Sequence, residues 1–352
     1  MTTKEKVLNI LLNNNNSQIS GEMLAEKCGV SRAAIWKAIN TLRGDGFQIE
    51  GTTNGGYIVK NEVDAFNKEL FTQYFYSSFP SFTNSNIECF SEIDSTNTYA
   101  KRLLASNGSF RDSKGELTPF GLKYNNSIII AESQTEGRGR LGRTFYSPKK
   151  TGIYLSIIYS PKGGITEPSR LTAFSAVAVK RAIKKLYNID AKIKWINDIF
   201  VNNKKVCGIL TEGFTNFETG TIEAAIIGIG INIEDNEEFF PKELQNVAGG
   251  ILKTSDNKVG RCKLGAQVAG EVLQVLNEDP EKVMDEYKEG SFIIGKVVEI
   301  HPVIGDDSKN YNAQVIDIDH KASLVVKMEN GEIKTLSSGE ISLTSSSFTK
   351  LN

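Results

Sequence analysis

Gly137-Arg138-Gly139-Arg140-Leu141-Gly142-Arg143 is the stretch that decides the fold class of this sequence. Its glycines satisfy the Gly-x-Gly-x-x-Gly spacing of dinucleotide-binding folds, in which a helix follows at once and an acidic residue lies about twenty positions further on. Here Phe145-Tyr146-Ser147-Pro148 and then a strand pattern follow, and residues 144–166 contain neither Asp nor Glu. The Gly-x-x-x-x-Gly-Lys-Ser/Thr spacing of a P-loop is not met either. The stretch therefore argues against both of these nucleotide-binding folds.

The same loop has the composition of a phosphate-binding site. Arginines alternate with glycines directly after the apolar strand pattern at 127–132. Glycine lets backbone amides approach an anion closely, and guanidinium groups bind phosphate oxygens in pairs. A flexible basic surface turn is the alternative, but such turns rarely combine this many arginines and glycines. We therefore expect the loop at 137–143 to bind phosphate.

Three further clusters carry polar groups at strand or helix ends. Lys192-Ile193-Lys194-Trp195-Ile196-Asn197-Asp198 alternates like a strand, with both lysines and Ile196 on one side. A lysine on a central strand needs an anion beside it, whereas an edge strand would leave both lysines in solvent. Gly228-Ile229-Gly230-Ile231-Asn232 lets a ligand approach a strand, or is a bulged core strand. Asp94-Ser95-Thr96-Asn97 alone indicates a plain helix start.

The first sixty residues predict a winged helix-turn-helix. Ser20 can cap a helix whose apolar residues recur at helical spacing, and a glycine ends that helix. A second helix at 32–42 follows the turn and carries Ile35 and Ile39 in one apolar stripe. Two short alternating strands around the Asn- and Gly-rich turn at 52–55 then form the wing.

Beyond this segment the pattern changes from mixed helices and strands to strands only. Residues 87–289 predict helices at 95–105, 168–187 and 262–277 and strands at 127–132, 153–159 and 224–229. Strands expected at 295–300, 311–318, 323–328 and 333–336, between Gly, Asn and Asp turns, predict a small closing β-barrel. The polar, glycine-containing segment 106–126 is expected to be a mobile surface insertion.

Composition excludes several classes of protein. With 39% hydrophobic and 24% charged residues, and neither a signal-like segment nor a membrane-length apolar run, the chain is expected to be cytoplasmic. A net charge of -1 limits any nucleic-acid contact to one local face. The four cysteines and two histidines lie too far apart for a zinc site, and the cysteines show no paired disulfide spacing. No metal site made by the protein alone is therefore expected.

In this order, the motifs resemble the bacterial family of bifunctional biotin ligases and biotin-operon repressors. The stretches that carry the resemblance are Ser31-Arg32-Ala33-Ala34-Ile35, Asp94-Ser95-Thr96-Asn97, Gln134, the 137–143 loop, Lys194-Trp195, Lys205-Val206-Cys207-Gly208-Ile209-Leu210, residues 228–232 and Gly339-Glu340-Ile341-Ser342. The chain departs from the family at two points. Ile196 stands where the family motif Lys-Trp-Pro-Asn-Asp has proline, and the 106–126 insertion is longer than the family pattern.

The resemblance implies a multi-domain α+β fold. Its parts would be a winged helix-turn-helix DNA-binding domain at 1–62, a linker at 63–82, a central mixed α/β class II synthetase-like ligase domain at 83–290 that binds biotin and ATP, and a C-terminal small SH3-like β-barrel at 291–352.

The resemblance also implies a reaction: biotin and ATP, with Mg²⁺, form biotinoyl-adenylate, and a lysine of biotin carboxyl carrier protein then attacks it. The implied catalytic residues are Lys194, Arg140 and Arg138. The implied biotin-binding residues are Ser95, Thr96, Asn97, Gln134, Arg138, Gly139, Arg140 and Lys194. The implied ATP- or adenylate-binding residues are Arg140, Arg143, Asn197, Asp198, Gly228, Gly230 and Asn232, of which Asn197 and Asp198 could hold Mg²⁺ or contact a phosphate.

For the first domain, the resemblance implies binding of operator DNA by the helix-turn-helix at 21–40. The expected contacts are Ser31, Arg32, Trp36 and Lys37. A homodimer is expected once the adenylate is bound, because single helix-turn-helix modules usually act in pairs on palindromic sites. Three alternatives stay open: a winged helix used only for protein contacts, a lipoate- or octanoate-type protein ligase, and a biotin-sensing repressor without turnover.

Overall fold

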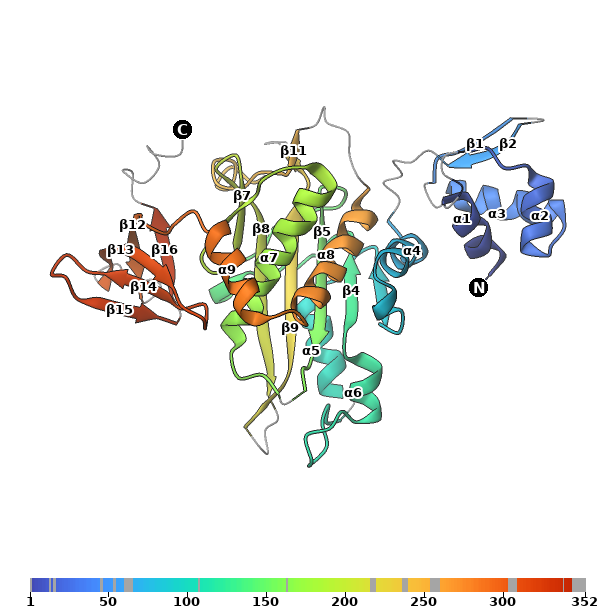
Figure 1. Ribbon diagram of the computed structural model, residues 1–352. Helices are drawn as coiled ribbons and strands as arrows, with labels where there is room; N and C mark the ends of the chain where they lie inside the picture. Colours follow the sequence, from blue (N-terminus) through green and yellow to red (C-terminus); the bar gives the residue numbers. More distant parts are fainter. Residues whose placement is uncertain are drawn as a thin grey trace. The chain divides into compact units, whose positions relative to one another are not determined.

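The chain folds into two compact units in the computed structural model (Figure 1). Met1–Thr83 with Asp256–Gln267 form the first unit, and Asn84–Ser255 with Val268–Asn352 form the second. The residues that the structure describes are 2–12, 14, 17–44, 47–52, 55–59, 66–106, 108–162, 164–215, 220–235, 240–253, 260–302, 309–337 and 339–343. The domain boundaries expected near residues 62, 82 and 290 stay predictions.

The first unit begins with the expected winged helix-turn-helix. Its elements are α1 (Thr3–Leu12), α2 (Gly21–Cys28), α3 (Arg32–Gly44) and the antiparallel hairpin of β1 (Ile49–Thr52) and β2 (Gly56–Val59). The Ser20 side chain caps α2 by accepting a hydrogen bond from the Met23 amide at 3.1 Å, and Gly29 ends the helix at φ 68°. Ile35 and Ile39 of α3 are buried, which leaves the opposite face of this helix exposed.

An aromatic helix continues the first unit. Its bounds are Lys68–Ser78 for α4, which the single turn η1 (Pro80–Phe82) follows. Asn67 caps α4 by accepting a hydrogen bond from the Leu70 amide at 2.9 Å. Phe71 and Phe75 are fully buried with ring centroids 6.2 Å apart. Residues 60–65, which precede this helix, lie outside the described part of the chain.

A seven-stranded mixed sheet organises the second unit. The strands lie in the order β3-β4-β5-β9-β8-β7-β6, with β3 parallel to β4 and the other neighbours antiparallel. Their bounds are β3 (Ile87–Phe90), β4 (Ser127–Ala131), β5 (Gly152–Tyr159), β6 (Lys192–Lys194), β7 (Asp198–Val201), β8 (Lys204–Thr215) and β9 (Ile222–Asn232). β4 and β5 are buried along their whole length, as their isoleucine-rich sequences require.

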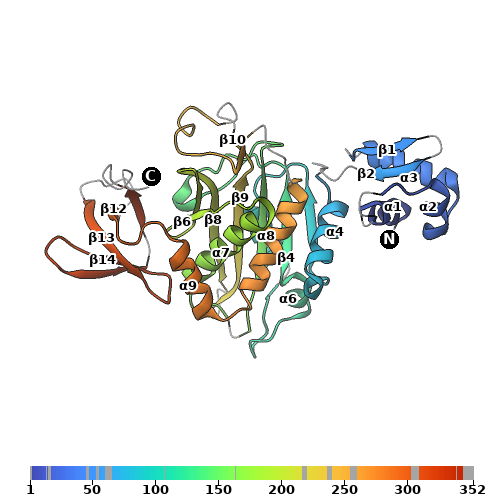
Figure 2. The ribbon, with the colours of Figure 1, turned by 45° about the horizontal axis from the view of Figure 1, so that its top comes forward.

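Helices cover both faces of this sheet (Figures 1 and 2). α7 (Pro168–Tyr187) and α9 (Pro280–Gly290) lie together on one face, beside the second-unit part of α8 (Arg261–Val275). α5 (Thr96–Ser106) packs on the opposite face, against β4, β5 and β9. α7 has the predicted bounds, because Pro168 suits a first turn and Asn188 ends the helix at φ 55°. No helix in the described ranges is long and apolar enough to cross a membrane.

A five-stranded antiparallel sheet matches the small SH3-like β-barrel expected near the C-terminus. The strands lie in the order β15-β14-β13-β12-β16. Their bounds are β12 (Val297–His301), β13 (Tyr311–Ile318), β14 (Leu324–Lys327), β15 (Ile333–Leu336) and β16 (Glu340–Leu343). β16 was not expected, because its pairing partner β12 lies about forty residues earlier in the chain and the sequence pattern does not show that pairing. Elsewhere in the second unit, β10 (Glu234–Asp235) and β11 (Leu252–Lys253) form a short parallel pair.

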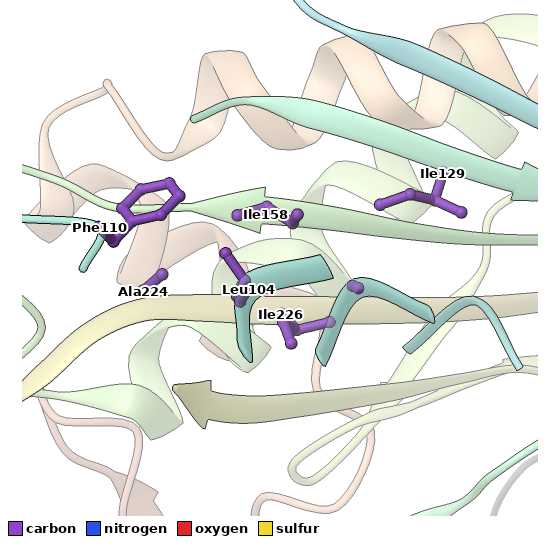
Figure 3. Packing of buried hydrophobic residues seen from close by; sticks show 7 residues of the cluster. Leu104, Phe110, Ile129, Ile158, Ala224 and Ile226 are labelled. Carbon is purple, nitrogen blue, oxygen red and sulfur yellow. The ribbon is translucent and has the colours of Figure 1, made fainter. Parts of the chain in front are cut away.

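The expectation of a mobile surface insertion at 106–126 is wrong. The segment contains α6 (Pro119–Tyr124), which Thr118 caps by accepting a hydrogen bond from the Gly121 amide at 3.1 Å. Phe110 is fully buried, and its cluster (Figure 3) is completed by Ala100, Leu104, Ile129, Ile158, Ala224 and Ile226. Composition missed this core contribution because one buried aromatic ring anchors a mostly polar segment.

Phe110→Ala should lower the free energy of unfolding by about 3–5 kcal/mol, because it opens a cavity in this cluster. Urea denaturation followed by circular dichroism measures the loss. Leu122→Ala on α6 is the matched control, since that side chain is 69% exposed and its loss should change stability by less than about 0.5 kcal/mol. Equal stability of Phe110→Ala and the native chain would contradict a core role for the insertion.

Candidate active site

A cavity of about 260 Å³ opens on the α5 side of the large sheet, within the second unit. It is lined by the start of α5, by strands β5, β7, β8 and β9, by the glycine- and arginine-rich loop and by residues of the 240–248 segment. The expected site residues found in its lining are Ser95, Thr96, Asn97, Gln134, Arg138, Gly139, Arg140, Arg143, Asn197, Asp198, Gly228, Gly230 and Asn232. Motifs far apart in the sequence therefore meet in one cavity.

Glycines on the central strands make room for this cavity. Gly230 of β9 pairs in register with Gly208 of β8, and a methyl group on Gly230 would lie 2.4 Å from the Phe145 ring. Similarly, a methyl group on Gly228 would lie 2.3 Å from the side-chain oxygen of Asn97. Because real contacts of this kind essentially never fall below 3.0 Å, a Cβ atom is excluded at both positions unless its neighbour moves. The ligand-approach interpretation of residues 228–232 thus fits the structure.

Hydrogen bonds fix the neutral polar end of the cavity. The Thr96 amide donates to Gln134 Oε1 at 2.9 Å, which orients the glutamine, and Gln134 Nε2 donates to Ser147 Oγ at 2.9 Å. Ser156 Oγ is within donor distance of two acceptors, Thr96 Oγ1 at 2.7 Å and Asn97 Oδ1 at 2.6 Å. Buried polar groups need such partners, so their orientations are set before any ligand arrives.

The cationic end carries arginines and a lysine. Arg140 donates from Nη1 to Asn197 Oδ1 at 3.0 Å and from Nη2 to the Gly339 carbonyl at 3.2 Å. Lys205 Nζ lies 2.7 Å from Asp198 Oδ1. Arg138 and Arg143 also line the cavity. Four cations and one carboxylate give this end a positive balance, which suits a polyanion.

The glycine- and arginine-rich loop closes on itself beside the cavity. The Gly139 amide donates to the Arg143 carbonyl at 2.7 Å, around the single turn η2 (Arg140–Gly142). The Phe145 amide donates to the Gly137 carbonyl at 2.9 Å, and a methyl group on Gly137 would lie 2.2 Å from the Phe145 carbonyl. The loop is therefore a compact turn followed by a strand segment, and not the start of a long helix.

Among the residues expected to bind biotin, ATP or the adenylate, Lys194 is the one that does not line the cavity. It ends the edge strand β6, where its register partner is Asp198 of β7. Lys205 of β8 lies in the cavity wall and pairs with Asp198. Lys205 stands in one of the motifs that carry the family resemblance, but its sequence context assigned it no role. The Trp195–Ile196 peptide bond nearby is cis.

An apolar wall was also missed by the sequence analysis. Phe240, Leu244, Val247 and Ala248 line the cavity, and Val247 is 55% exposed. Backbone hydrogen bonds join this segment to Lys205: the Lys205 amide donates to the Val247 carbonyl at 2.8 Å. The segment shows no motif, so only its position in the fold identifies it. A flat apolar group could pack against it.

Two buried groups near the cavity have shifted pKa values. Burial raises the pKa of the Cys207 thiol, which keeps the thiol protonated and unreactive at neutral pH. Burial also raises the pKa of Tyr287, whose hydroxyl donates to the Ile196 carbonyl at 3.2 Å. Within the described residues, no three His, Cys, Asp or Glu side chains gather as a metal site. The arginines and the lysine in its lining equip the cavity to bind negative charge.

In the first unit, the expected DNA contacts lie at and just before the start of α3. Ser31, Arg32, Trp36 and Lys37 are exposed, and Trp36 is 61% exposed despite its size. Ser31 Oγ accepts a hydrogen bond from the Ala34 amide at 3.2 Å and so caps the helix. Exposed cations beside an exposed aromatic ring are suited to contact with nucleic acid.

Comparison with known protein families assigns the cavity region and the helix-turn-helix region to different families. Residues 92–232 match the model of the Biotin/lipoate A/B protein ligase family, and residues 3–58 match that of the HTH domain. The first match spans the α5 start, the arginine-rich loop and the cavity strands. The chain thus carries a ligase-family region joined to a helix-turn-helix domain.

Whole-chain comparisons narrow the class. The protein named Bifunctional ligase/repressor BirA of Bacillus spizizenii is 28% identical over 97% of this chain and 99% of its own length, and the protein of that name from Escherichia coli K12 is 28% identical over 93% of each. The structure titled Biotin protein ligase from Aquifex aeolicus in complex with biotin and ATP matches the fold with a TM-score of 0.56 at 23% identity, covering 73% of this chain and 97% of the other. Over nearly its whole length this chain is similar to proteins named as bifunctional ligase/repressors, which confirms the resemblance seen in its sequence.

Gly230→Ala should destabilise the protein by about 1–3 kcal/mol, because its methyl group must displace the Phe145 ring from the cavity wall. Urea denaturation measures the change. Gly213→Ala on β8 is the control, since a methyl group there meets only flexible Ile222 atoms at 3.3 Å or more. A fully stable Gly230→Ala chain would show that the glycine is not needed.

Proposed function

We propose that this chain activates biotin with ATP, forms biotinoyl-adenylate and pyrophosphate, and transfers the biotin to a lysine of a biotin carboxyl carrier protein. One observation carries the proposal: a single cavity joins a neutral hydrogen-bonding end to a cationic end. The first suits the urea of biotin, and the second suits the phosphates of ATP. The names of the relatives, which combine ligase and repressor, agree with this function.

Adenylation needs cations more than it needs a base. A carboxylate and an α-phosphate repel one another, so positive groups must hold both anions within reach. Arg138, Arg140, Arg143 and Lys205 are the cations of the cavity. In the second step the attacking amine comes from the carrier protein and leaves AMP as the product. The enzyme therefore needs no nucleophile of its own, and it works by positioning its substrates.

We assign the role expected for Lys194 to Lys205. Lys205 shares the cavity wall with the arginines, and its contact with Asp198 holds its ammonium in a defined place. Lys194 has its backbone on the sheet edge and is absent from that wall. A contact with both the carboxylate of biotin and the phosphate is therefore open to Lys205. Arg138 and Arg140 keep their expected roles.

The remaining lining residues fit the other parts of the substrates. Ser95, Thr96 and Gln134 offer neutral hydroxyl and amide groups to the neutral urea. The apolar wall at 240–248 suits the flat adenine ring. Asn232, beside Gly230, suits contact with the adenylate.

A magnesium ion would enter with ATP. Mg²⁺ typically keeps several waters and is held by one or two carboxylates together with substrate phosphates. Asp198 is the carboxylate in the described lining, and Asn197 lies beside it. These residues fit a magnesium held mainly by ATP, where it would offset phosphate charge. They do not suggest a resident metal.

The first unit would bind operator DNA through the exposed face of α3, and adenylate formation would favour a homodimer. A DNA-binding helix gains affinity when two copies engage a palindrome, so any ligand that favours the dimer also favours DNA binding. The arginine-rich loop is the segment we expect to change on ligand binding, since it lines the cavity. The insertion at 106–126 is not a candidate, because its described residues do not line the cavity. A cytoplasmic location stays a prediction.

Lys205→Met should reduce biotin-dependent pyrophosphate release by about ten- to a hundred-fold, because it removes a charge-assisted contact of about 1.5–3 kcal/mol. Lys194→Met is the matched control and should keep a rate near that of the native chain. Pyrophosphate release with and without biotin measures both variants. A larger loss in Lys194→Met would return the catalytic role to that residue, and biotin-independent release by the native chain would remove the proposed function.

Biotin together with ATP, but not ATP alone, should tighten operator binding and raise the fraction of dimer. Sedimentation and operator titration at fixed salt measure the two effects, since phosphate contacts make DNA affinity salt-dependent. Lys37→Ala should weaken operator binding with and without ligand, while its pyrophosphate release stays native. If biotin with ATP changes neither the dimer fraction nor the operator affinity, DNA binding does not depend on the occupancy of the ligase cavity.

A further inference from the structure

A carboxylate lies behind the polar end of the cavity without lining it. Glu212 is on β8, near the middle of the seven-stranded sheet, and its side chain is only 18% exposed. Its Oε1 lies 2.6 Å from Lys101 Nζ, and its Oε2 accepts a hydrogen bond from Asn97 Nδ2 at 2.9 Å. Asn97 and Lys101 are one turn apart on α5, so Glu212 holds one face of that helix against the sheet.

Both N–H donors of the Asn97 amide are used in hydrogen bonds, so the amide oxygen is the atom that faces the cavity. Asn97 Nδ2 donates to Glu212 and also to the Leu210 carbonyl at 3.3 Å. If the amide were rotated by half a turn, its oxygen would face a carboxylate and a carbonyl, which both repel it. Glu212 therefore keeps the Asn97 oxygen directed at Ser156 and over the lining residue Gly228.

The Ser156 hydroxyl makes that oxygen available to a ligand. Ser156 Oγ lies within donor distance of both Asn97 Oδ1 and Thr96 Oγ1, but it has a single hydrogen. When it donates to Thr96, the Asn97 oxygen has room for another donor. Because Asn97 and Thr96 both line the cavity, this end offers an oriented acceptor to an N–H group.

We propose that Glu212 is a positioning residue that makes the polar end of the cavity selective for a ligand carrying N–H donors. The inference rests on the proposed function, in which the urea of biotin supplies those donors. An apolar ligand end, such as a dithiolane ring or an alkyl tail, offers no donor to the second lone pair of the Asn97 oxygen, which then has only Ser156 as a partner, and such a ligand binds less well. Glu212 touches no ligand and acts through Asn97.

The test separates the effect of side-chain length at position 212 from the effect of the carboxylate charge. Glu212→Gln keeps the length and an oxygen that accepts from Asn97, whereas Glu212→Asp keeps the charge but is one methylene too short. We expect Glu212→Asp and Glu212→Ala to weaken biotin binding at least ten-fold, and Glu212→Gln to stay within about three-fold of the native chain. Calorimetry on the full chain without ATP measures the affinities for biotin and for lipoate. The KM for ATP should not change.

Two controls separate positioning from general destabilisation. Glu271→Ala breaks the contact of a 10% exposed glutamate with Lys185 on α7, away from the cavity, and should bind biotin as the native chain does. Adding Glu212→Ala to Asn97→Ala should cause no further loss of biotin affinity, since Glu212 acts through Asn97.

Each outcome decides the inference. Native biotin affinity in Glu212→Asp, additive losses in the double variant, or an equal loss in Glu212→Gln would overturn it while leaving the ligase proposal intact. A smaller ratio of biotin affinity to lipoate affinity in Glu212→Asp than in the native chain supports the inference. A native chain that binds no biotin would overturn both this inference and the proposed function.

Discussion

The site depends on the absence of side chains at the centre of the large sheet. Most of β9 carries isoleucine or alanine, but Gly228 and Gly230 face α5, where Asn97 and Phe145 occupy the space of their missing Cβ atoms. A cavity in a close-packed interior must be kept open by such a constraint, since larger side chains would fill it. The ring of Phe145 and the amide of Asn97 then become walls of the cavity, and the hydrogen-bonded groups around them take fixed positions.

The two ends of the cavity are held in different ways. Thr96, Gln134 and Ser147 form a chain of neutral hydrogen bonds, whereas Arg140 reaches Asn197 and the Gly339 carbonyl of the C-terminal segment. Fixed donors and charges lower an activation barrier because they need no reorganisation during the reaction. The contact with Gly339, just before β16, shows that the C-terminal segment takes part in holding the arginine-rich loop. This supports a role for the C-terminal segment in the site as well as in packing.

Sequence patterns predicted the local features well and the long-range ones poorly. α7 was predicted with its observed bounds, because proline and asparagine mark its ends and an amphipathic pattern fills it. Phe110 and β16 were missed since their packing partners lie far away in the chain. Motifs also located most of the cavity lining. The sequence could not show that Lys205 lines the cavity and Lys194 does not, because this requires knowing that β6 is the sheet edge and β8 lies inside it. The apolar wall at 240–248 had no motif to reveal it.

In the proposed function, one cavity joins a biotin-binding end to an ATP-binding end, and the product passes to a carrier protein. The most direct measurement incubates the full chain with ATP, Mg²⁺, labelled biotin and a biotin carrier domain, and follows label on the carrier lysine. We expect ATP-dependent labelling of the carrier lysine. Excess unlabelled biotin should suppress this labelling, and excess lipoate should not. Equal suppression of labelling by lipoate and by biotin, or no labelling by a folded chain, would contradict the proposed function.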